Sequence, residues 1–296
     1  NFTNFIFGCS SWNREFNVIS YEKFNNQKRM NKKPPIIKSG LFGIGLDTYW
    51  PQFDGLKERL EGYQSQISVK MEGYGAQVIN LGLVDSPLMA SEKAELLKKE
   101  DIDILFLYVA TYALSSTVLP LVQKITCPII ILNIQPVAAI DYESFNKLGD
   151  RGKMTGEWLA HCQACSVPEI GNVFNRSEVN YELVTGYLGE QKVWDEIQQW
   201  IEAAYVASVM QKNRLGLLGH YYCGMLDVYS DLTKQSAAFG THIEIIEMCE
   251  VKKYRDVLKT REIDKKIAEF RESFDVIDSC EKAELVRAAM TSIALD

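Results

Sequence analysis

The sequence lacks the features that would serve a membrane or a nucleic acid. It has no run of about 18 uncharged apolar residues, the length that a membrane-spanning helix needs. Its formal net charge is −7 and its pI is 5.2, so the chain as a whole has no positive field to hold a phosphate backbone. We therefore expect neither a membrane nor a nucleic acid as partner.

Cysteine and histidine are both sparse, and their placement excludes further classes. The seven cysteines are odd in number, dispersed and mostly in apolar segments, which is typical of reduced thiols in a cytoplasmic protein. The three histidines, His161, His220 and His242, are never three or four residues apart, so no helical pair for a transition metal is expected. The sequence also has no P-loop and no Gly-x-Ser-x-Gly nucleophile elbow.

What the sequence does have is a regular alternation of short apolar runs and amphipathic stretches. The run 104–109 is apolar at every position, which indicates a strand covered by helices on both faces. Strands that alternate with helices of 10 to 18 residues predict βαβ units and a mainly parallel, doubly wound sheet. The strands are expected at 36–46, 76–81, 102–109 and 128–132, and the helices at 53–70, 90–99 and 115–124.

A second series of the same kind follows a stretch, 134–180, that is rich in Gly and Pro and predicts a linker with short helices. We expect two Rossmann-like lobes, an N-terminal α/β domain at 35–175 and a second α/β domain with a helical tail at 176–296. In the second series, strands are expected at 182–186, 214–218 and 241–246, and helices at 190–211, 225–239 and within 252–295.

The two ends of the chain differ from the rest. Residues 1–40 carry seven Lys and Arg against two Glu, and the segment 1–34 is expected to be a basic extension that is disordered or non-native. Met30 would then be the natural start. The last helix has no Gly or Pro to end it, which indicates a truncated chain.

Candidate site residues gather where strands are expected to end, the place where open α/β sheets bind ligands. Asp47 stands beside the aromatic residues Tyr49 and Trp50 after the first strand, a combination that suits a polyol. The alternative is a capping Asp with core aromatics. The preceding Gly43-Ile-Gly45 lacks the third glycine of a dinucleotide fingerprint. The lone C-x-x-C at Cys162 and Cys165 is a weak signal for zinc or redox chemistry.

Four segments, in this order and spacing, resemble the N-terminal two-thirds of bacterial L-arabinose isomerases, especially the divergent L-arabinose/L-fucose isomerase-like branch. They are Leu41 to Gly55, Thr111-Tyr112, Cys162 to Gly171 and Gly219 to Asp227.

The resemblance implies an aldose–ketose isomerase that converts L-arabinose to L-ribulose, or acts on a related sugar, with a divalent metal, usually Mn²⁺. It also implies a homo-oligomer, hexamer-like, with active sites between subunits. The metal-binding Glu and His of the family lie in a C-terminal, β-rich catalytic domain that this chain would lack, so the chain alone is expected to bind no metal and to be inactive.

By position in the family, the residues expected to contact the sugar are Asp47, Tyr49, Tyr112, Gln163, Cys165 and Met225. Cys162 and Cys165 fall near a glutamine and a histidine of typical members, and a cysteine lacks the hydrogen-bonding capacity of an imidazole. Another pentose, a 6-deoxyhexose or a different polyol therefore stays open as the substrate. The alternative function is a non-catalytic sugar-binding α/β module.

Overall fold

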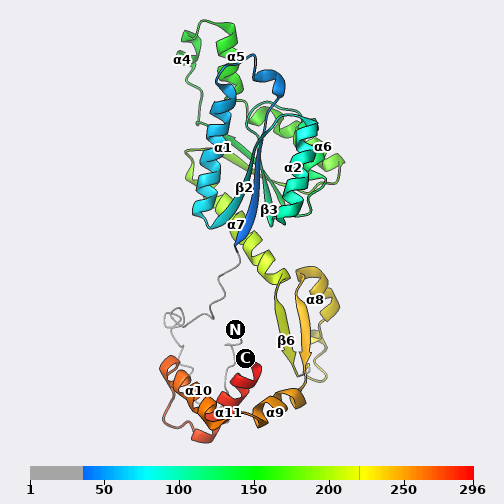
Figure 1. Cartoon of the computed structure of the whole chain (residues 1–296), viewed down its shortest axis with the longest axis vertical. Coiled ribbons are helices and arrows are strands. Elements are labelled where there is room, and N and C mark those ends of the chain that lie inside the picture. The colour runs from blue at the N-terminus through cyan, green and yellow to red at the C-terminus, as the bar shows by residue number, and fades with distance from the viewer. Residues whose placement is uncertain (1–35, 220) are drawn as a thin grey trace. The chain divides into compact units, whose positions relative to one another are not determined.

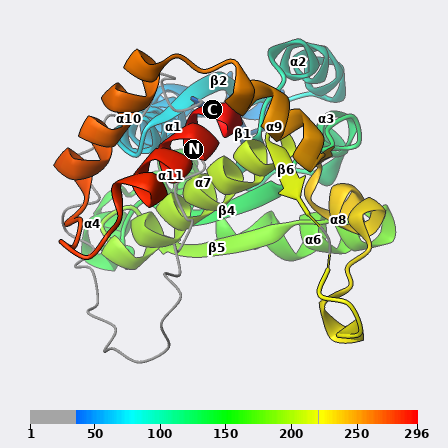
Figure 2. The ribbon, with the colours of Figure 1, turned by 90° about the horizontal axis from the view of Figure 1, so that it is seen from below.

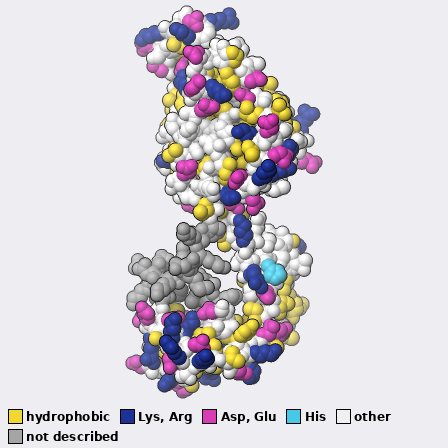
Figure 3. Space-filling model, in the orientation of Figure 1, with side chains coloured by type: hydrophobic (Ala, Val, Ile, Leu, Met, Phe, Trp, Pro, Cys, Tyr) yellow, Lys and Arg dark blue, Asp and Glu magenta, His cyan; other side chains and the backbone are white. Residues whose placement is uncertain are grey.

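The computed structural model describes residues 36–219 and 221–296, so the predicted extension at 1–34 and His220 lie outside the described residues. The described residues form two compact units, 36–210 and 211–296 (Figure 1). On the face drawn in Figure 3, acidic and basic side chains are interspersed.

The first unit is built on a parallel sheet of five strands in the order β2-β1-β3-β4-β5, which is a common order of doubly wound sheets. Every neighbouring pair in the sheet is parallel. The α/β fold with a mainly parallel sheet is thereby confirmed. The strands are β1 (Ile37–Ile44), β2 (Ala76–Val84), β3 (Ile104–Tyr108), β4 (Ile129–Gln135) and β5 (Glu182–Tyr187).

Helices cover both faces of this sheet (Figure 1). One face carries α1 (Leu56–Gly73) and α7 (Gln191–Gln211), and the other carries α2 (Pro87–Glu100), α3 (Leu119–Val122) and α6 (Val167–Arg176). β3 explains this arrangement, because its side chains alternate between the two faces and all five are buried. Phe106 and Tyr108 enter the core beneath α1 and α7, while Leu105 and Leu107 enter the opposite core.

Local sequence signals fix where these helices begin. The Ser86 hydroxyl accepts from the Met89 backbone N–H at 3.3 Å, and Pro87 occupies the first turn of α2, where a missing N–H costs nothing. Asp150 caps α5 (Arg151–Leu159) in the same way, by accepting from the Lys153 N–H at 2.8 Å. A shorter helix, α4 (Tyr142–Lys147), precedes α5.

The second unit contains a parallel pair of strands, β6 (Arg214–Leu218) and β7 (His242–Ile246), joined through α8 (Leu232–Phe239). Gly240 ends α8 with φ of +70°, a conformation that favours glycine. Three helices follow, and Figure 2 shows α10 and α11 packed beside each other. They are α9 (Met248–Asp256), α10 (Thr260–Ser273) and α11 (Lys282–Leu295). Within the described residues, this unit is one βαβ element with a helical tail.

The structure divides the chain further along than the sequence analysis did, after residue 210 rather than after residue 175. The reason is that β5 pairs with β4 over six residues, and α7 then packs its apolar stripe on the same sheet. The stretch 134–180 is also more than a linker, because Ile170 and Phe174 of α6 are buried against the sheet. No helix among the described residues is both long enough and apolar enough to cross a membrane.

Candidate functional site

The candidate site lies at the carboxyl edge of the five-stranded sheet, between β1 and β3. From β1 the chain turns to α1 on one face and on to β2 at the sheet edge, whereas from β3 it turns to α3 on the opposite face and on to β4. The two loops therefore separate at this point, a topological switch point, which is where open α/β sheets bind their ligands.

The loop after β1 is held in place by Trp50. Its indole Nε1 donates to Asp85 Oδ2 at 2.8 Å, and Asp85 is itself buried at the end of β2. The ring lies against Gly45, where an added Cβ would be 2.6 Å from ring carbons, so any larger residue there would displace the indole. The loop forms a short 3-10 helix, Asp47–Tyr49, in which Asp47 is exposed and Tyr49 packs edge-on against Phe53 at a centroid distance of 6.0 Å.

The loop after β3 brings a second tyrosine to the same place. Thr111 is fully buried, and its hydroxyl donates to the Leu159 carbonyl at 2.7 Å, which ties this loop to the end of α5. The next residue, Tyr112, is 40% exposed. The pKa of Tyr49 is raised by burial first, then by the nearby Tyr112 and by Cys162. Tyr112 and Cys162 thus both lie within electrostatic reach of Tyr49.

The connector after α5 supplies the third wall of the site, and Gln163 anchors it. Its side chain is fully buried, and Nε2 donates to the carbonyls of Ala110 and Ala160, each at 2.9 Å. Gln135, at the end of β4, completes the anchor when its amide is oriented to donate, with its nitrogen 2.7 Å from Gln163 Oε1. On either side of Gln163, the Cys162 thiol donates to the Cys165 sulfur at 2.6 Å.

A charged pair holds α5, the helix that leads into the connector, against α1. The Arg59 guanidinium donates to both carboxylate oxygens of Glu157, at 2.5 and 3.2 Å, and its Nε donates to the Tyr63 hydroxyl at 2.7 Å. This pairing lowers the pKa of Glu157 below its usual value. One turn later, Nδ1 of His161 lies 2.9 Å from the Glu157 carbonyl, and the short 3-10 helix Ala164–Ser166 follows.

The structure brings together four of the six predicted sugar contacts, namely Tyr49, Tyr112, Gln163 and Cys165, with Asp47 exposed on the loop of Tyr49. The Gln163 side chain, however, is buried, and its amide nitrogen donates to backbone carbonyls rather than facing a ligand. Met225 belongs to the other unit, in the loop after β6, where it is 47% exposed.

Sequence reasoning gave no positioning role to Gln135 or Thr111, although both hold the connector in place. The only signal was a polar residue at the end of each apolar strand run, after Ile134 and after Ala110 respectively.

The donor set of this site does not fit Mn²⁺. Hard divalent cations prefer several carboxylates and carbonyls, whereas the residues gathered here offer phenols, thiols, an amide that is already engaged and the single carboxylate of Asp47. Across the described part of the chain, no group of three or more His, Cys, Asp or Glu side chains could hold a metal ion.

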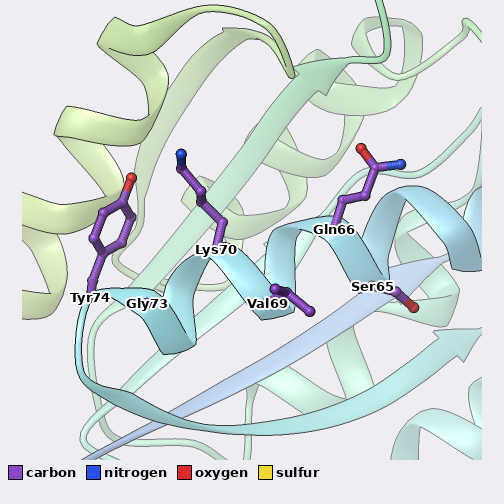
Figure 4. A pocket seen from close by; sticks show the side chains of 6 residues that line it. All are labelled: Ser65, Gln66, Val69, Lys70, Gly73 and Tyr74. Atoms are coloured by element: carbon purple, nitrogen blue, oxygen red, sulfur yellow. The ribbon is translucent and has the colours of Figure 1, made fainter.

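A surface hollow of about 590 Å³ lies elsewhere on the first unit, along α1 (Figure 4). Val69 is exposed in it, and the Lys70 ammonium lies 5.6 Å from the ring centroid of Trp194. This hollow extends to Gly73 and Tyr74, directly before β2 begins at Ala76. It therefore opens toward the amino edge of the sheet, away from the candidate site.

Comparison with models of protein families gave no match to this chain, and neither did a search among curated proteins.

Proposed function

We propose that the first unit binds an open-chain monosaccharide at the carboxyl edge of its sheet, as the sugar-contacting part of an aldose–ketose isomerase of the L-arabinose isomerase type. The observation that supports this most directly is the meeting of Tyr49, Tyr112 and the Gln163 connector at the switch point between β1 and β3. These residues come from loops more than 50 positions apart along the chain.

The chemistry of the side chains suits a polyol. The exposed Asp47 carboxylate accepts hydrogen bonds from sugar hydroxyls, and the phenol of Tyr112 both donates and accepts them. The faces of Tyr49 and Tyr112 offer apolar contact to the C–H faces of a sugar. Gln163 acts by holding the connector in place, and Cys165 lies exposed on that connector.

The rest of the enzyme is part of the same proposal. The βαβ element of the second unit would belong to a second Rossmann-like lobe that carries Met225, and a neighbouring subunit of a cytoplasmic homo-oligomer would complete the active site. The residues at this site do not fit Mn²⁺, so in this proposal the ligands of the metal and the acid–base glutamates would lie outside the described residues.

The competing function is a non-catalytic sugar-binding module. The observation in its favour is that the groups at the switch point are aromatic and hydrogen-bonding, which is sufficient for binding and requires no chemistry. Fold alone does not separate the two functions.

Calorimetric titration of the 296-residue chain with L-arabinose, L-fucose and ribitol tests the binding step. We expect saturable binding that Tyr112→Ala weakens at least tenfold, whereas Tyr142→Ala, at a more exposed site on α4, leaves it unchanged. Ketose formation from a bound aldose in the presence of Mn²⁺ would identify the isomerase. Binding without turnover, in the native assembly as well, would favour the binding module, and no binding of any polyol would refute both.

A further inference from the structure

The two sulfurs of the C-x-x-C segment lie unusually close together. Cys162 Sγ and Cys165 Sγ are 2.6 Å apart, and both residues are free thiols. This separation is only about half an ångström longer than a disulfide bond of roughly 2.05 Å. A small change in side-chain torsion would therefore be enough to form a bond between them.

The backbone around the pair is fixed, so this proximity is built into the fold. Gln163, between the two cysteines, is fully buried and donates to two backbone carbonyls. On the far side of Cys165, the hydroxyl of Ser166 is 3.4 Å from the Thr111 carbonyl, and Ser166 is also buried. The turn is thus tied to the end of β3 on both sides of Cys165, which keeps the sulfurs together.

The two thiols are unequal in a way that assigns them different roles. Cys165 is exposed, whereas Cys162 is only 2% exposed and donates its S–H to the Cys165 sulfur. Burial, followed by the contact with Cys165, raises the pKa of Cys162 well above its usual range. Cys165 is therefore the thiol that a small disulfide can reach, and the buried Cys162 is placed to attack the mixed disulfide that forms on Cys165.

We propose that Cys162 and Cys165 form a reversible dithiol–disulfide couple that reacts with low-molecular-mass disulfides. The Cys165 thiolate attacks one sulfur of the small disulfide, whose S–S bond breaks, and one thiolate leaves and takes up a proton. Cys162 then loses its proton to water, and its sulfur attacks Cys165 Sγ and expels the second thiolate. In sum, two electrons and two protons pass from the cysteine pair to the small disulfide, which becomes two thiols.

The couple adjoins the candidate ligand site. Cys162 is close enough to Tyr49 to affect its ionisation, and Tyr112 lies close to the same Tyr49. Oxidation removes the S–H donor of Cys162 and draws the two ends of the turn together beside these tyrosines. We therefore expect oxidation to change the affinity of the site for its polyol, a consequence that depends on the proposed function.

The test is a redox titration of the full 296-residue chain in mixtures of reduced and oxidised glutathione. After each mixture is quenched with acid and the chain is denatured, the remaining thiols are blocked with N-ethylmaleimide, and the labels are located by peptide mass spectrometry. We expect Cys162 and Cys165 to lose their labels together as the glutathione disulfide fraction rises, with no glutathione retained on either residue. Cys127→Ser is the matched control, and it should leave the titration of the Cys162–Cys165 pair unchanged. Cys127 lies in a different loop of the same unit, and burial raises its pKa to about 12.

Two variants separate the steps. In Cys162→Ala, Cys165 should retain one glutathione, because the thiol that resolves the mixed disulfide is absent. In Cys165→Ser, which changes an exposed side chain, Cys162 should remain a free thiol in every glutathione mixture. It should therefore be fully labelled by N-ethylmaleimide once the chain is denatured, and it should carry no glutathione.

The proposal is overturned if both cysteines of the unmodified chain stay reduced in the most oxidising mixture, or if glutathione persists on Cys165 while Cys162 is present. Since neither readout involves a sugar, a failure here is distinct from a failure of the proposed function. Titration of the oxidised and reduced forms with the polyol then tests whether the redox state of the cysteine pair changes the affinity of the candidate site. Equal affinities of the two forms would contradict that link.

Discussion

The indole of Trp50 and the carboxylate of Asp85 form a hydrogen bond of 2.8 Å that joins the loop after β1 to the end of β2. Asp85 is only 8% exposed, so this contact satisfies a carboxylate that has little access to water. The same indole covers Gly45, and the loop that it fixes carries Asp47 and Tyr49. The position of one wall of the candidate site thus depends on this pair.

Removal of the indole donor should destabilise the protein. Trp50→Phe keeps an aromatic ring but leaves the Asp85 carboxylate without this partner, which typically costs about 1–3 kcal/mol. Urea denaturation followed by circular dichroism measures the change. Trp158→Phe is the control, because Trp158 is 45% exposed on α5, and its free energy of unfolding should change by less than about 0.5 kcal/mol. Equal effects of the two variants would contradict the role given to the Trp50–Asp85 bond.

Two glycines provide a matched test of packing. An added Cβ at Gly45 would meet the Trp50 ring at 2.6 Å, so Gly45→Ala should cost about 1–3 kcal/mol of stability through overpacking. At Gly62, inside α1, nothing lies within 4 Å of the added atom, and Gly62→Ala should stabilise the protein by roughly 0.5–1 kcal/mol. Thermal unfolding of both variants shows whether each change lowers or raises the stability relative to the unmodified protein. If Gly45→Ala left the stability unchanged, the loop that carries Trp50 would be able to shift at little cost in free energy.

The pair of Arg59 and Glu157 predicts a pH-dependent contribution to stability. Because the pKa of Glu157 is lowered in the folded state, the contribution is complete above the unfolded pKa of about 4.3 and is lost as the pH falls through the lower folded value. Both side chains are about one-third exposed, so solvent limits the contribution to about 0.5–1 kcal/mol.

The measurement compares the unmodified protein with Glu157→Gln by urea denaturation at several pH values. The difference in free energy of unfolding should be present at neutral pH and should shrink below about pH 4. Glu143→Gln, which removes an exposed pair with Lys147 on α4, should differ by only a few tenths of a kcal/mol throughout. If the difference in free energy of unfolding for Glu157→Gln grew as the pH fell, a stabilising pair between Arg59 and the Glu157 carboxylate would be contradicted.

The sequence was informative about the sheet and less so about the site. The uninterrupted apolar run of β3 predicts a strand buried on both faces, because burial of every position requires helices above and below. A strand was also expected at 182–186, where β5 lies, but the strand that it pairs with was not predicted. β5 is a half-exposed edge strand, and its local pattern carries no information on which sheet it joins.

The hydrogen bonds that anchor the connector could not be predicted from the sequence, for a different reason. Gln163 donates to Ala110, 53 residues away, and Gln135 reaches it from the end of β4. Hydrogen bonds between side chains and distant backbone leave no periodicity in a sequence. Asp47 and Tyr49 could be placed at the carboxyl edge beforehand, because their position follows from the strand that precedes them.

Gln163 provides the sharpest test of how the connector is held. Gln163→Leu keeps the volume of the side chain but leaves the buried carbonyls of Ala110 and Ala160 without their donor, which should cost roughly 2–4 kcal/mol for two acceptors. Gln66→Leu, an equally conservative change at an exposed position of α1, should change the stability by less than about 0.5 kcal/mol. Urea denaturation measures both.

The same variant also separates positioning from contact. Because Gln163 is fully buried, its loss should act on the site only through the connector, so proteolysis near residues 160–166 should accelerate in parallel with any fall in polyol affinity. Tyr112→Ala, which changes an exposed side chain, should lower the affinity without that acceleration. If Gln163→Leu lowered the affinity while the connector stayed fully protected from protease, Gln163 would have to touch the ligand itself, and the positioning role would be wrong.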